Sequence, residues 1–308
     1  MSAADYCVDT NVGLVGFGLM GSAITARFRS RGLHVAVFAR SKDEATKIRA
    51  EGGRPVTSFA ELTASTATIC LSLPTEAAVA NVLLGVDGIL ESSHAGTVVV
   101  DTSTIHPKGA RMFADEACAR DCAYLDAPVS GGPAAATDGR LTLMVGGSML
   151  AFQKVEPLLR SLGTTVVWMG GPGSGQVAKA CNQLVVAANI EAVAEALVLA
   201  KKCGLDPARV RMALEGGFAG SAALTIHGSR MLRHDFEPGA RAALHVKDAD
   251  IFESLSREAG VPIPLGAAAR VALHSLAKSG KGDLDHSALV LPLEEASGCS
   301  VEADAEPT

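Results

Sequence analysis

The chain has 308 residues, of which 48% are hydrophobic and 19% are charged, and its formal net charge is -6. This composition excludes a disordered chain, and at about 150 residues per domain the length predicts two domains, each with a core of its own. The negative charge argues against nucleic acid or an anionic membrane as a partner, because both attract clustered positive charge.

The cysteines and histidines also limit the possible functions. The seven cysteines are scattered and include no CxxC pair, a pattern typical of a reducing cytosol. The eight histidines lack metal-ligand spacing, so we predict no metal site. Residues 1–10 lack the apolar run of a signal peptide, and no stretch approaches about 18 uninterrupted apolar residues. We therefore expect a soluble, cytoplasmic protein.

From residue 11 to about residue 169, short β-branched runs alternate with longer, Ala-rich helical stretches. This alternation predicts an α/β domain with a doubly wound, mainly parallel sheet that is covered on both faces. The predicted strands are residues 12–15, 34–38, 68–73, 97–101, 123–127, 141–147 and 164–169.

After the glycine-rich residues 170–175 the pattern predicts helices alone. The first, from 175 to about 202, is apolar on most faces, which predicts burial between two domains or two subunits. Its Glu191 and Glu195 argue against a membrane span. Gly or Pro marks further helix ends at 203–207, 215–221, 237–239 and 260–266, and the acidic tail from Glu294 is expected to fray. We thus expect an α/β domain over residues 1–172 and an all-helical domain over residues 173–308.

A glycine pattern follows the first predicted strand. Residues 16–21 read GFGLMG, a GxGxxG between an apolar strand and a helix. In dinucleotide-binding folds its glycines allow the tight turn, the approach of backbone to a pyrophosphate and the packing of helix on strand. The helix N-terminus then offers free N–H groups and its dipole to the phosphates. The residues expected to bind the dinucleotide are Gly16, Phe17, Gly18, Leu19, Met20 and Gly21.

The end of the second predicted strand distinguishes the two nicotinamide dinucleotides. An acidic residue there binds the ribose 2′-hydroxyl, whereas an arginine accommodates a 2′-phosphate. Here Ala39 stands where the acid is expected, and Arg40, Ser41 and Lys42 follow. Two cations and a hydroxyl suit a phosphate monoester, and we expect no carboxylate there to repel it. We therefore predict NADP as the cofactor, with NAD as the alternative; a solvated basic turn is the other interpretation.

The long helix carries one lysine near its start, among apolar neighbours. Lys179 is expected at about the third helical position, with Asn182 and Gln183 three and four positions later on the same face. An isolated lysine is most often a solvated surface charge. Beside the positive end of a helix, however, a cation is disfavoured by the dipole. Its position therefore favours an amine placed for function.

Four motifs occur in order between residues 11 and about 291: GFGLMG (16–21), DAPVSGGPAAATDGRLTLMVGG (126–147), GSGQVAKACNQ (173–183) and HVKDADI (245–251). Together they resemble the β-hydroxyacid dehydrogenase family, the group of 3-hydroxyisobutyrate dehydrogenase and tartronate semialdehyde (2-hydroxy-3-oxopropionate) reductase. The resemblance implies an N-terminal Rossmann domain, an all-helical C-terminal domain and an active site in the cleft between them. It also implies NAD(P)-dependent, reversible hydride transfer between a small 3-hydroxy acid and its semialdehyde or ketone.

By motif position Lys179 matches the family's catalytic lysine. A neutral amine would take the hydroxyl proton during oxidation, and the ammonium would return it during reduction. The ordinary lysine pKa of about 10.4 must be lowered for a base that works near neutrality. The helix end and an oxidised nicotinamide would lower it, and a substrate carboxylate would raise it again.

The resemblance also assigns substrate-binding residues. Ser130, Gly131 and Gly132 match the family's substrate loop, where a hydroxyl and backbone N–H groups can approach a carboxylate. Asn182 matches a family amide near the lysine. Gln183 departs from the Asn-Asn pair of hydroxyisobutyrate dehydrogenases and is similar to the Asn-Gln of the tartronate semialdehyde reductase branch, which leaves the substrate open.

Other residues match the family's cofactor contacts. Lys247 matches a lysine that reaches toward cofactor and substrate from the helical domain, while its neighbour Asp248 is expected to be structural. Two segments, 72–79 and 101–107, resemble loops at the carboxyl edge of the Rossmann sheet, where cofactors lie. The residues expected to line the nicotinamide ribose pocket are Leu73, Pro74, Ser103 and Thr104.

Two other functions stay open. An imine reductase shares this architecture, but Lys179 and the intact Ser-Gly-Gly sequence count against it, because that lysine position usually holds another residue in imine reductases. A catalytically silent NADPH-binding protein would keep the fold, but relatives of that kind lack the lysine. The partners we expect are a small hydroxy acid or semialdehyde and further copies of the chain, in a homodimer or homotetramer.

Overall fold

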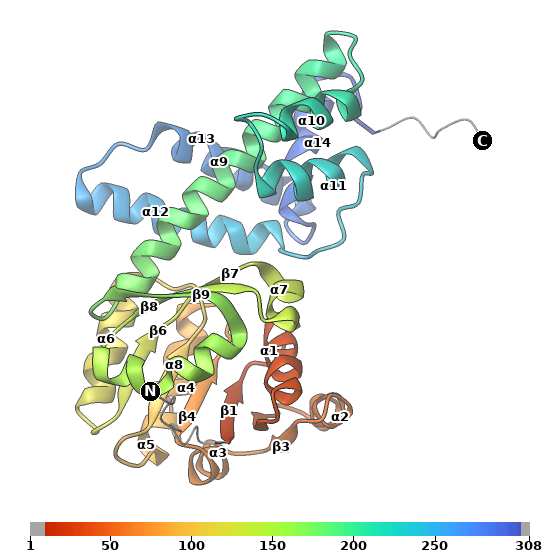
Figure 1. Ribbon diagram of the computed structural model, residues 1–308. Helices are drawn as coiled ribbons and strands as arrows, with labels where there is room; N and C mark the ends of the chain where they lie inside the picture. Colours follow the sequence, from red (N-terminus) through yellow and green to blue (C-terminus); the bar gives the residue numbers. More distant parts are fainter. Residues whose placement is uncertain (1–9, 303–308) are drawn as a thin grey trace, which may run out of the picture. The chain divides into compact units, whose positions relative to one another are not determined.

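The computed structural model describes residues 10–302, and its contacts divide the chain after Lys179 into two compact units. The first unit contains a nine-stranded sheet within the described residues, in the order β3-β2-β1-β4-β5-β6-β8-β7, with β9 on β8 (Figure 1). The strands are β1 (Asn11–Val15), β2 (His34–Phe38), β3 (Arg54–Val56), β4 (Thr68–Leu71), β5 (Val98–Asp101), β6 (Ala123–Asp126), β7 (Val129–Ser130), β8 (Leu141–Gly146) and β9 (Gly163–Gly170).

The sheet is mainly parallel, as predicted. The pairs from β3 to β6 and the β8–β9 pair are parallel, whereas β8 runs antiparallel to β6 and β7. All seven predicted strands are present. The two that the sequence pattern missed, β3 and β7, have three and two residues. Such short segments show no alternation, and Pro55 at the centre of β3 is tolerated because β3 is an edge strand.

Helices cover both faces of this sheet. Side chains of α1, α2, α7 and α8 belong to the core on one face, and side chains of α3 to α6 belong to the core on the other. These helices are α1 (Leu19–Ser30), α2 (Lys42–Ala50), α3 (Phe59–Ser65), α4 (Glu76–Leu84), α5 (Ile89–Ser92), α6 (Pro107–Cys118), α7 (Gly132–Asp138) and α8 (Met149–Leu162).

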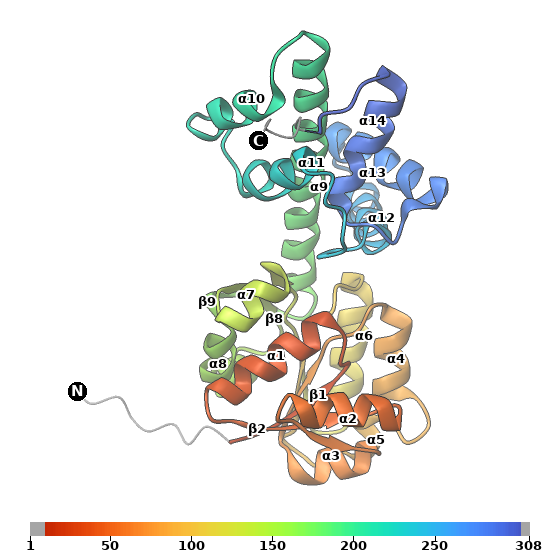
Figure 2. The same cartoon turned by 90° about the vertical axis from the view of Figure 1, so that its right-hand side faces the viewer.

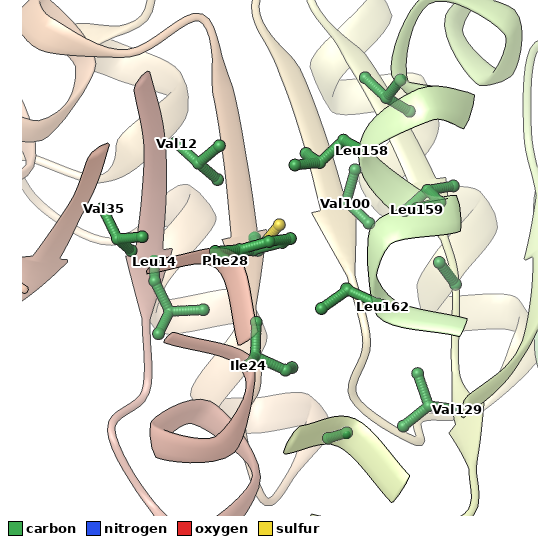
Figure 3. Packing of buried hydrophobic residues seen from close by; sticks show 14 of the residues in the cluster. Val12, Leu14, Ile24, Phe28, Val35, Val100, Val129, Leu158, Leu159 and Leu162 are labelled. Carbon is green, nitrogen blue, oxygen red and sulfur yellow. The ribbon is translucent and has the colours of Figure 1, made fainter. Parts of the chain in front are cut away.

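The strands alternate between the two cores, because successive strand side chains point to opposite faces. Val98 and Val100 of β5 lie in one core and Val99 in the other. Figure 3 shows the first of these cores, where side chains of α1 and α8 face those of the central strands. This doubly covered packing explains why the strands read as continuous apolar runs. Because β1, β2, β4 and β5 are parallel, the loops that follow them lie at the same edge of the sheet.

The second unit is helical, as predicted. In the view of Figure 2, α10 and α11 lie on one side of α9 and α12 to α14 on the other. The helices are α9 (Ser174–Lys202), whose first six residues belong to the first unit, α10 (Pro207–Glu215), α11 (Ser229–Leu232), α12 (Ala242–Ala259), α13 (Pro264–Leu276) and α14 (Val290–Ser297). Short π-helical turns lie at Leu224–Gly228 and Ala277–Lys281, and a 3-10 turn lies at His286–Leu289.

Helix α9 is long and apolar enough to cross a membrane by length and composition. In this unit, however, it is a core helix. Ile190, Ala194 and Leu197 are fully buried and pack with Phe252 of α12 and Leu273 of α13. One face of α9 is thus part of the helical core, whereas Val185 and Leu199 on the same helix are exposed.

The expectation that the chain frays from Glu294 is wrong for residues 294–302. Helix α14 continues to Ser297, and the Glu294 carboxylate is buried. It accepts hydrogen bonds from the Val301 N–H at 2.6 Å and from Ser300, and it contacts His234 at 3.0 Å. Composition misled here, because an acidic residue that finds such partners is part of the packed unit. The remainder of the predicted tail, like residues 1–9, lies outside the described residues.

Glu191 on α9 gives the second unit a pH dependence. Its Oε2 is buried without a hydrogen-bond partner among the described residues. Burial, followed by the nearby charge of Glu195, raises the pKa of Glu191 from 4.5 to about 7. The folded protein therefore holds this proton more tightly than the unfolded chain, so the stabilisation is complete below about pH 4.5 and is lost as pH rises to about 7.

We expect Glu191→Gln to be more stable than the parent protein at pH 8 and to lose this advantage near pH 5. The measurement is Tm by calorimetry between pH 5 and 8. Glu295→Gln, a change at an exposed position of α14, is the control, because Glu295 is not among the groups that raise the pKa of Glu191. Parallel Tm curves for the parent and Glu191→Gln would show that Glu191 does not titrate in this range.

Candidate active site

The loop between β1 and α1 is closely packed at its first and last glycines and open at its second. A Cβ atom on Gly16 would overlap the Ser72 carbonyl oxygen, and one on Gly21 would overlap the Gly16 carbonyl oxygen. Both glycines are therefore required by close backbone packing. A Cβ atom on Gly18 would meet nothing within 4 Å, and Gly18 begins α1 without a side-chain cap. The open space at Gly18 and the uncapped helix end fit a pyrophosphate.

Two of the four residues predicted to line the ribose pocket are joined directly. The Leu73 N–H donates to the Ser103 hydroxyl oxygen at 2.9 Å, which ties the loop after β4 to the loop after β5. Ser103 is 4% exposed, whereas Thr104 is half-buried and Pro74 is exposed. Ser103 thus holds the two loops together, and Thr104 and Pro74 have the more accessible side chains.

The predicted 2′-phosphate site differs in one respect from the expectation. Arg40, Ser41 and Lys42 lie directly after β2 and are exposed. The sequence interpretation assumed that no carboxylate stands beside them, and this is wrong. Glu44 forms an ion pair with the Arg40 guanidinium at 2.8 Å, and the Glu44 N–H donates to the Ser41 hydroxyl at 3.1 Å. The first turn of α2 brings Glu44 back onto the residues that precede it.

Lys179 is buried and bonded to the predicted substrate loop. It is 7% exposed, and its Nζ donates to the Val129 carbonyl at 2.8 Å. Val129 and Ser130 form β7, and Gly131 and Gly132 follow at the start of α7. The fold therefore places the amine directly beside the backbone that carries the Ser-Gly-Gly sequence.

The predicted place of Lys179 within its helix needs correction. Helix α9 begins at Ser174, so Lys179 is its sixth residue and lies in the second turn. The dipole effect falls off within the first turn. The argument from the helix end is therefore weaker than the sequence suggested, and burial is the stronger indication that this amine is not a solvated surface charge.

Two side chains that the sequence analysis did not assign hold the start of α9. The Asp126 carboxylate accepts from the Gly173 N–H at 2.8 Å and from the Gln176 N–H at 2.9 Å. Burial raises the pKa of Asp126 to about 6, although these hydrogen bonds oppose the shift. The Gln176 side chain donates to the Ser103 carbonyl and accepts from the Ile105 N–H. The helix that carries Lys179 is thus fixed to one of the predicted cofactor loops.

The predicted substrate residues of the second unit form a chain of side-chain contacts. Asn182 Nδ2 donates to Gln183 Oε1 at 2.8 Å, and Gln183 Nε2 donates to Asp248 Oδ2 at 2.6 Å. Lys247 Nζ lies 3.0 Å from Asp248 Oδ1. Because an ionised carboxylate only accepts, Asp248 fixes which way both amides point. Asp248, expected to be structural, therefore orients the residues around it.

Two protein-family models match the chain. Residues 11–170 match the family model described as the NAD binding domain of 6-phosphogluconate dehydrogenase. Residues 173–293 match the model described as NAD-binding of NADP-dependent 3-hydroxyisobutyrate dehydrogenase. The chain is also 39% identical over 285 residues to the 2-hydroxy-3-oxopropionate reductase of Escherichia coli K12, an alignment that covers 92% of this chain and 97% of the relative.

The chain belongs to the β-hydroxyacid dehydrogenase family. Solved structures agree with this assignment. A 3-hydroxyisobutyrate dehydrogenase from Salmonella typhimurium superposes with a TM-score of 0.84 at 27% identity, covering 92% of this chain and 99% of its own. One from Mycobacterium tuberculosis gives a TM-score of 0.81 at 30% identity, covering 92% and 98%. This β-hydroxyacid dehydrogenase is therefore an enzyme of class EC 1.1.1, an NAD(P)-dependent hydroxyacid oxidoreductase.

One cluster of this β-hydroxyacid dehydrogenase resembles a metal site that sequence spacing did not indicate. Potential ligand atoms of His227, Asp285 and His286 lie within 4.8 Å of one another. Asp285 already accepts hydrogen bonds from Ser287 and from two backbone N–H groups, and the Arg230 guanidinium lies 3.7 Å away. Burial lowers the pKa of His286 to about 3. A carboxylate with these partners and a nearby cation is better suited to joining backbone segments than to holding a metal.

Sequence reasoning missed three residues that shape the site of this β-hydroxyacid dehydrogenase: Glu44, Asp126 and Gln176. Only Glu44 left a readable signal, because Ser41 and Glu44 have the spacing of a capping box at a helix start. Asp126 and Gln176 are 50 positions apart, and the bond between them depends on how β6 meets α9. Pairings of that kind have no local pattern in a sequence.

Proposed function

We propose that this enzyme interconverts a small 3-hydroxy acid and its semialdehyde or ketone, prefers NADP, and uses Lys179 to donate or accept the proton. One observation carries the proposal. Lys179 is a buried amine bonded to the Val129 carbonyl, directly before the Ser-Gly-Gly sequence that suits a carboxylate. An amine with this surrounding, in a family of hydroxyacid oxidoreductases, suits general acid and base catalysis at a substrate oxygen.

In oxidation, the neutral Lys179 amine takes the proton of the substrate hydroxyl. In reduction, the ammonium returns a proton to the carbonyl oxygen. The nicotinamide, when bound, accepts or supplies the hydride. The Val129 carbonyl accepts an N–H of Lys179 and so directs the amine beside the backbone that leads to the Ser-Gly-Gly sequence. The hydroxyl of Ser130 and the backbone N–H groups of Gly131 and Gly132 hold the substrate carboxylate.

The family resemblance also assigns substrate contacts to residues of the second unit. With Gln183 held by Asp248, the Asn182 amide presents its Nδ2 to Gln183 and keeps Oδ1 as an acceptor for a substrate hydroxyl. Lys247, whose Nζ lies 3.0 Å from Asp248 Oδ1, supplies a positive charge beside these amides. The 39% identity to an enzyme named 2-hydroxy-3-oxopropionate reductase favours a substrate with a carboxylate and a second oxygen function.

The test is the absorbance of the nicotinamide at 340 nm with both dinucleotides and a panel of acids of three to five carbons. We expect NADPH oxidation with tartronate semialdehyde and related aldehyde acids, and slower or no turnover of a cyclic imine. Preferred turnover of the imine would support an imine reductase. Dinucleotide binding without turnover of any panel member would support a silent binding protein.

Arg40→Ala tests the cofactor preference. Because a guanidinium binds a phosphate through charge-assisted hydrogen bonds, we expect the Kd for NADPH to rise by roughly tenfold and the Kd for NADH by less than about twofold. Titration of the intrinsic fluorescence of each reduced dinucleotide measures both constants. Equal losses for the two cofactors would contradict a 2′-phosphate contact at Arg40.

A further inference from the structure

The Arg40 side chain is held by a carboxylate from its own βα loop. Its Nε and Nη2 contact Glu44 at 3.2 and 2.8 Å, and the Arg40 backbone N–H donates to the same carboxylate at 2.7 Å. The Glu44 side chain is 12% exposed, whereas that of Arg40 is 78% exposed. Glu44 is therefore the half-buried partner of this ion pair, and the guanidinium is the solvent-exposed partner.

The carboxylate is ionised under ordinary conditions. The hydrogen bond from Arg40 is the main cause that lowers the pKa of Glu44, and it outweighs the opposing effect of burial. Ser41 begins α2, and its hydroxyl accepts from the Glu44 N–H, which fixes the backbone from which the carboxylate projects. The ionised Glu44 carboxylate thus lies beside Arg40, the residue that is expected to bind a 2′-phosphate.

The bonds to Glu44 occupy the Nε and Nη2 edge of the Arg40 guanidinium, an edge that can bind a phosphate. An arginine holds a phosphate best through two parallel N–H groups, and the Nε and Nη2 pair is one such fork. With Glu44 on that fork, a phosphate must displace the carboxylate or use the remaining edge. Either way the phosphate lies close to a like charge, which costs binding free energy that an NADH molecule does not lose.

We infer that Glu44 is a specificity-determining residue that acts through Arg40: by holding the Nε and Nη2 edge of the guanidinium, it weakens the preference for NADPH over NADH. The inference rests on the proposed binding of the 2′-phosphate at Arg40. Ala39 stands where an NAD-specific enzyme has an acidic residue, but the neighbouring Arg40 is already paired with Glu44. The weakened preference makes the enzyme able to use both dinucleotides.

The test is Glu44→Gln, which keeps an oxygen that can accept from the Arg40 N–H but removes the charge. We expect the Kd for NADPH to fall by roughly fivefold and the Kd for NADH to change by less than about twofold. Fluorescence titration at low salt measures both. The gain should shrink at about 1 M salt, where charges are screened within about 3 Å.

Two further variants isolate the cause. Glu156 makes the same Nε and Nη2 contacts with Arg160 on α8, at 2.9 and 2.6 Å. Glu156→Gln is thus a matched change of charge and bonding that should leave both dinucleotide constants unchanged. In an Arg40→Ala background, Glu44→Gln should improve NADPH binding by less than in the parent protein, because the guanidinium through which Glu44 acts is absent and only direct repulsion of the phosphate remains.

The outcomes separate this inference from the proposed function. Weaker or unchanged NADPH binding in a Glu44→Gln protein with the parent Tm would overturn the role of Glu44, and so would an equal gain in the Arg40→Ala background. If Tm falls, Glu44→Asp, which keeps the charge but shortens its reach, provides the second measurement and should also tighten NADPH binding. Failure of the parent protein to bind either dinucleotide would instead overturn the proposed function.

Discussion

Replacing Lys179 by alanine is expected to lower kcat by at least about a thousandfold while leaving the Kd for NADPH nearly unchanged. The amine is the proposed proton donor and acceptor, and loss of general acid and base catalysis typically costs 10² to 10⁴ in rate. The proposed dinucleotide loop follows β1, and four strands separate β1 from β7, the strand of Val129 to which Lys179 is bonded. Steady-state kinetics and fluorescence titration of NADPH provide the two measurements.

Lys154 offers a matched control for this experiment. Its Nζ also donates to a backbone carbonyl, that of Gly96, at 2.8 Å, but from an exposed position on α8. Lys154→Ala removes the same kind of hydrogen bond and should leave kcat unchanged. Lys179→Arg, which keeps the charge but cannot give up its proton near neutrality, should be as inactive as Lys179→Ala. Activity within about tenfold of the parent, or about 1.4 kcal/mol of barrier, would remove Lys179 from the mechanism.

Gly18→Ala is expected to weaken binding of both dinucleotides by roughly a hundredfold without unfolding the protein. A Cβ atom on Gly18 meets nothing in the chain within 4 Å, so the fold tolerates it. The methyl group would stand where the backbone must approach the pyrophosphate, which is the role of the second glycine in this pattern. The measurements are the Kd of NADPH and NADH together with Tm.

Substitutions of two other glycines are the controls for Gly18→Ala. Gly171 also has open space around it, so Gly171→Ala should change neither Tm nor dinucleotide binding. Gly21→Ala should lower Tm, because its Cβ atom would overlap the Gly16 carbonyl oxygen. A Gly18→Ala protein that binds NADPH within threefold of the parent would show that the pyrophosphate does not lie at this loop.

The glycine pattern, the main strands and the family could be predicted from the sequence alone. The glycine pattern between β1 and α1 was readable because each glycine answers a local requirement of a tight strand-to-helix turn. The seven predicted strands were readable because parallel strands buried on both faces are continuous apolar runs. The family assignment rested on four ordered motifs, and the family models and relatives confirm it.

Two predictions were wrong because hydrogen-bond partners gave a residue a different environment from the one that the composition indicated. Glu294 was expected to fray with an acidic tail, yet it is buried against Val301 and His234. The basic turn after β2 was expected to be free of carboxylates, yet Glu44 folds back onto Arg40. In both segments the residue types are as charged as expected, but residue type alone does not determine which donor pairs with which acceptor.

The sequence by itself determined the alternation of strands and helices and the glycine pattern between β1 and α1, because these depend on local periodicity and on residue types at fixed spacing. It proposed Lys179 as the catalytic residue through the resemblance to the family. Only the tertiary structure decided that Lys179 is buried on the Val129 carbonyl, that Asp126 and Gln176 hold the start of its helix, and that Asp248 fixes the amide of Gln183. Each of these bonds joins residues at least 50 positions apart. Their hydrogen-bond partners are set by how strands and helices pack, and no local pattern in the chain records that packing.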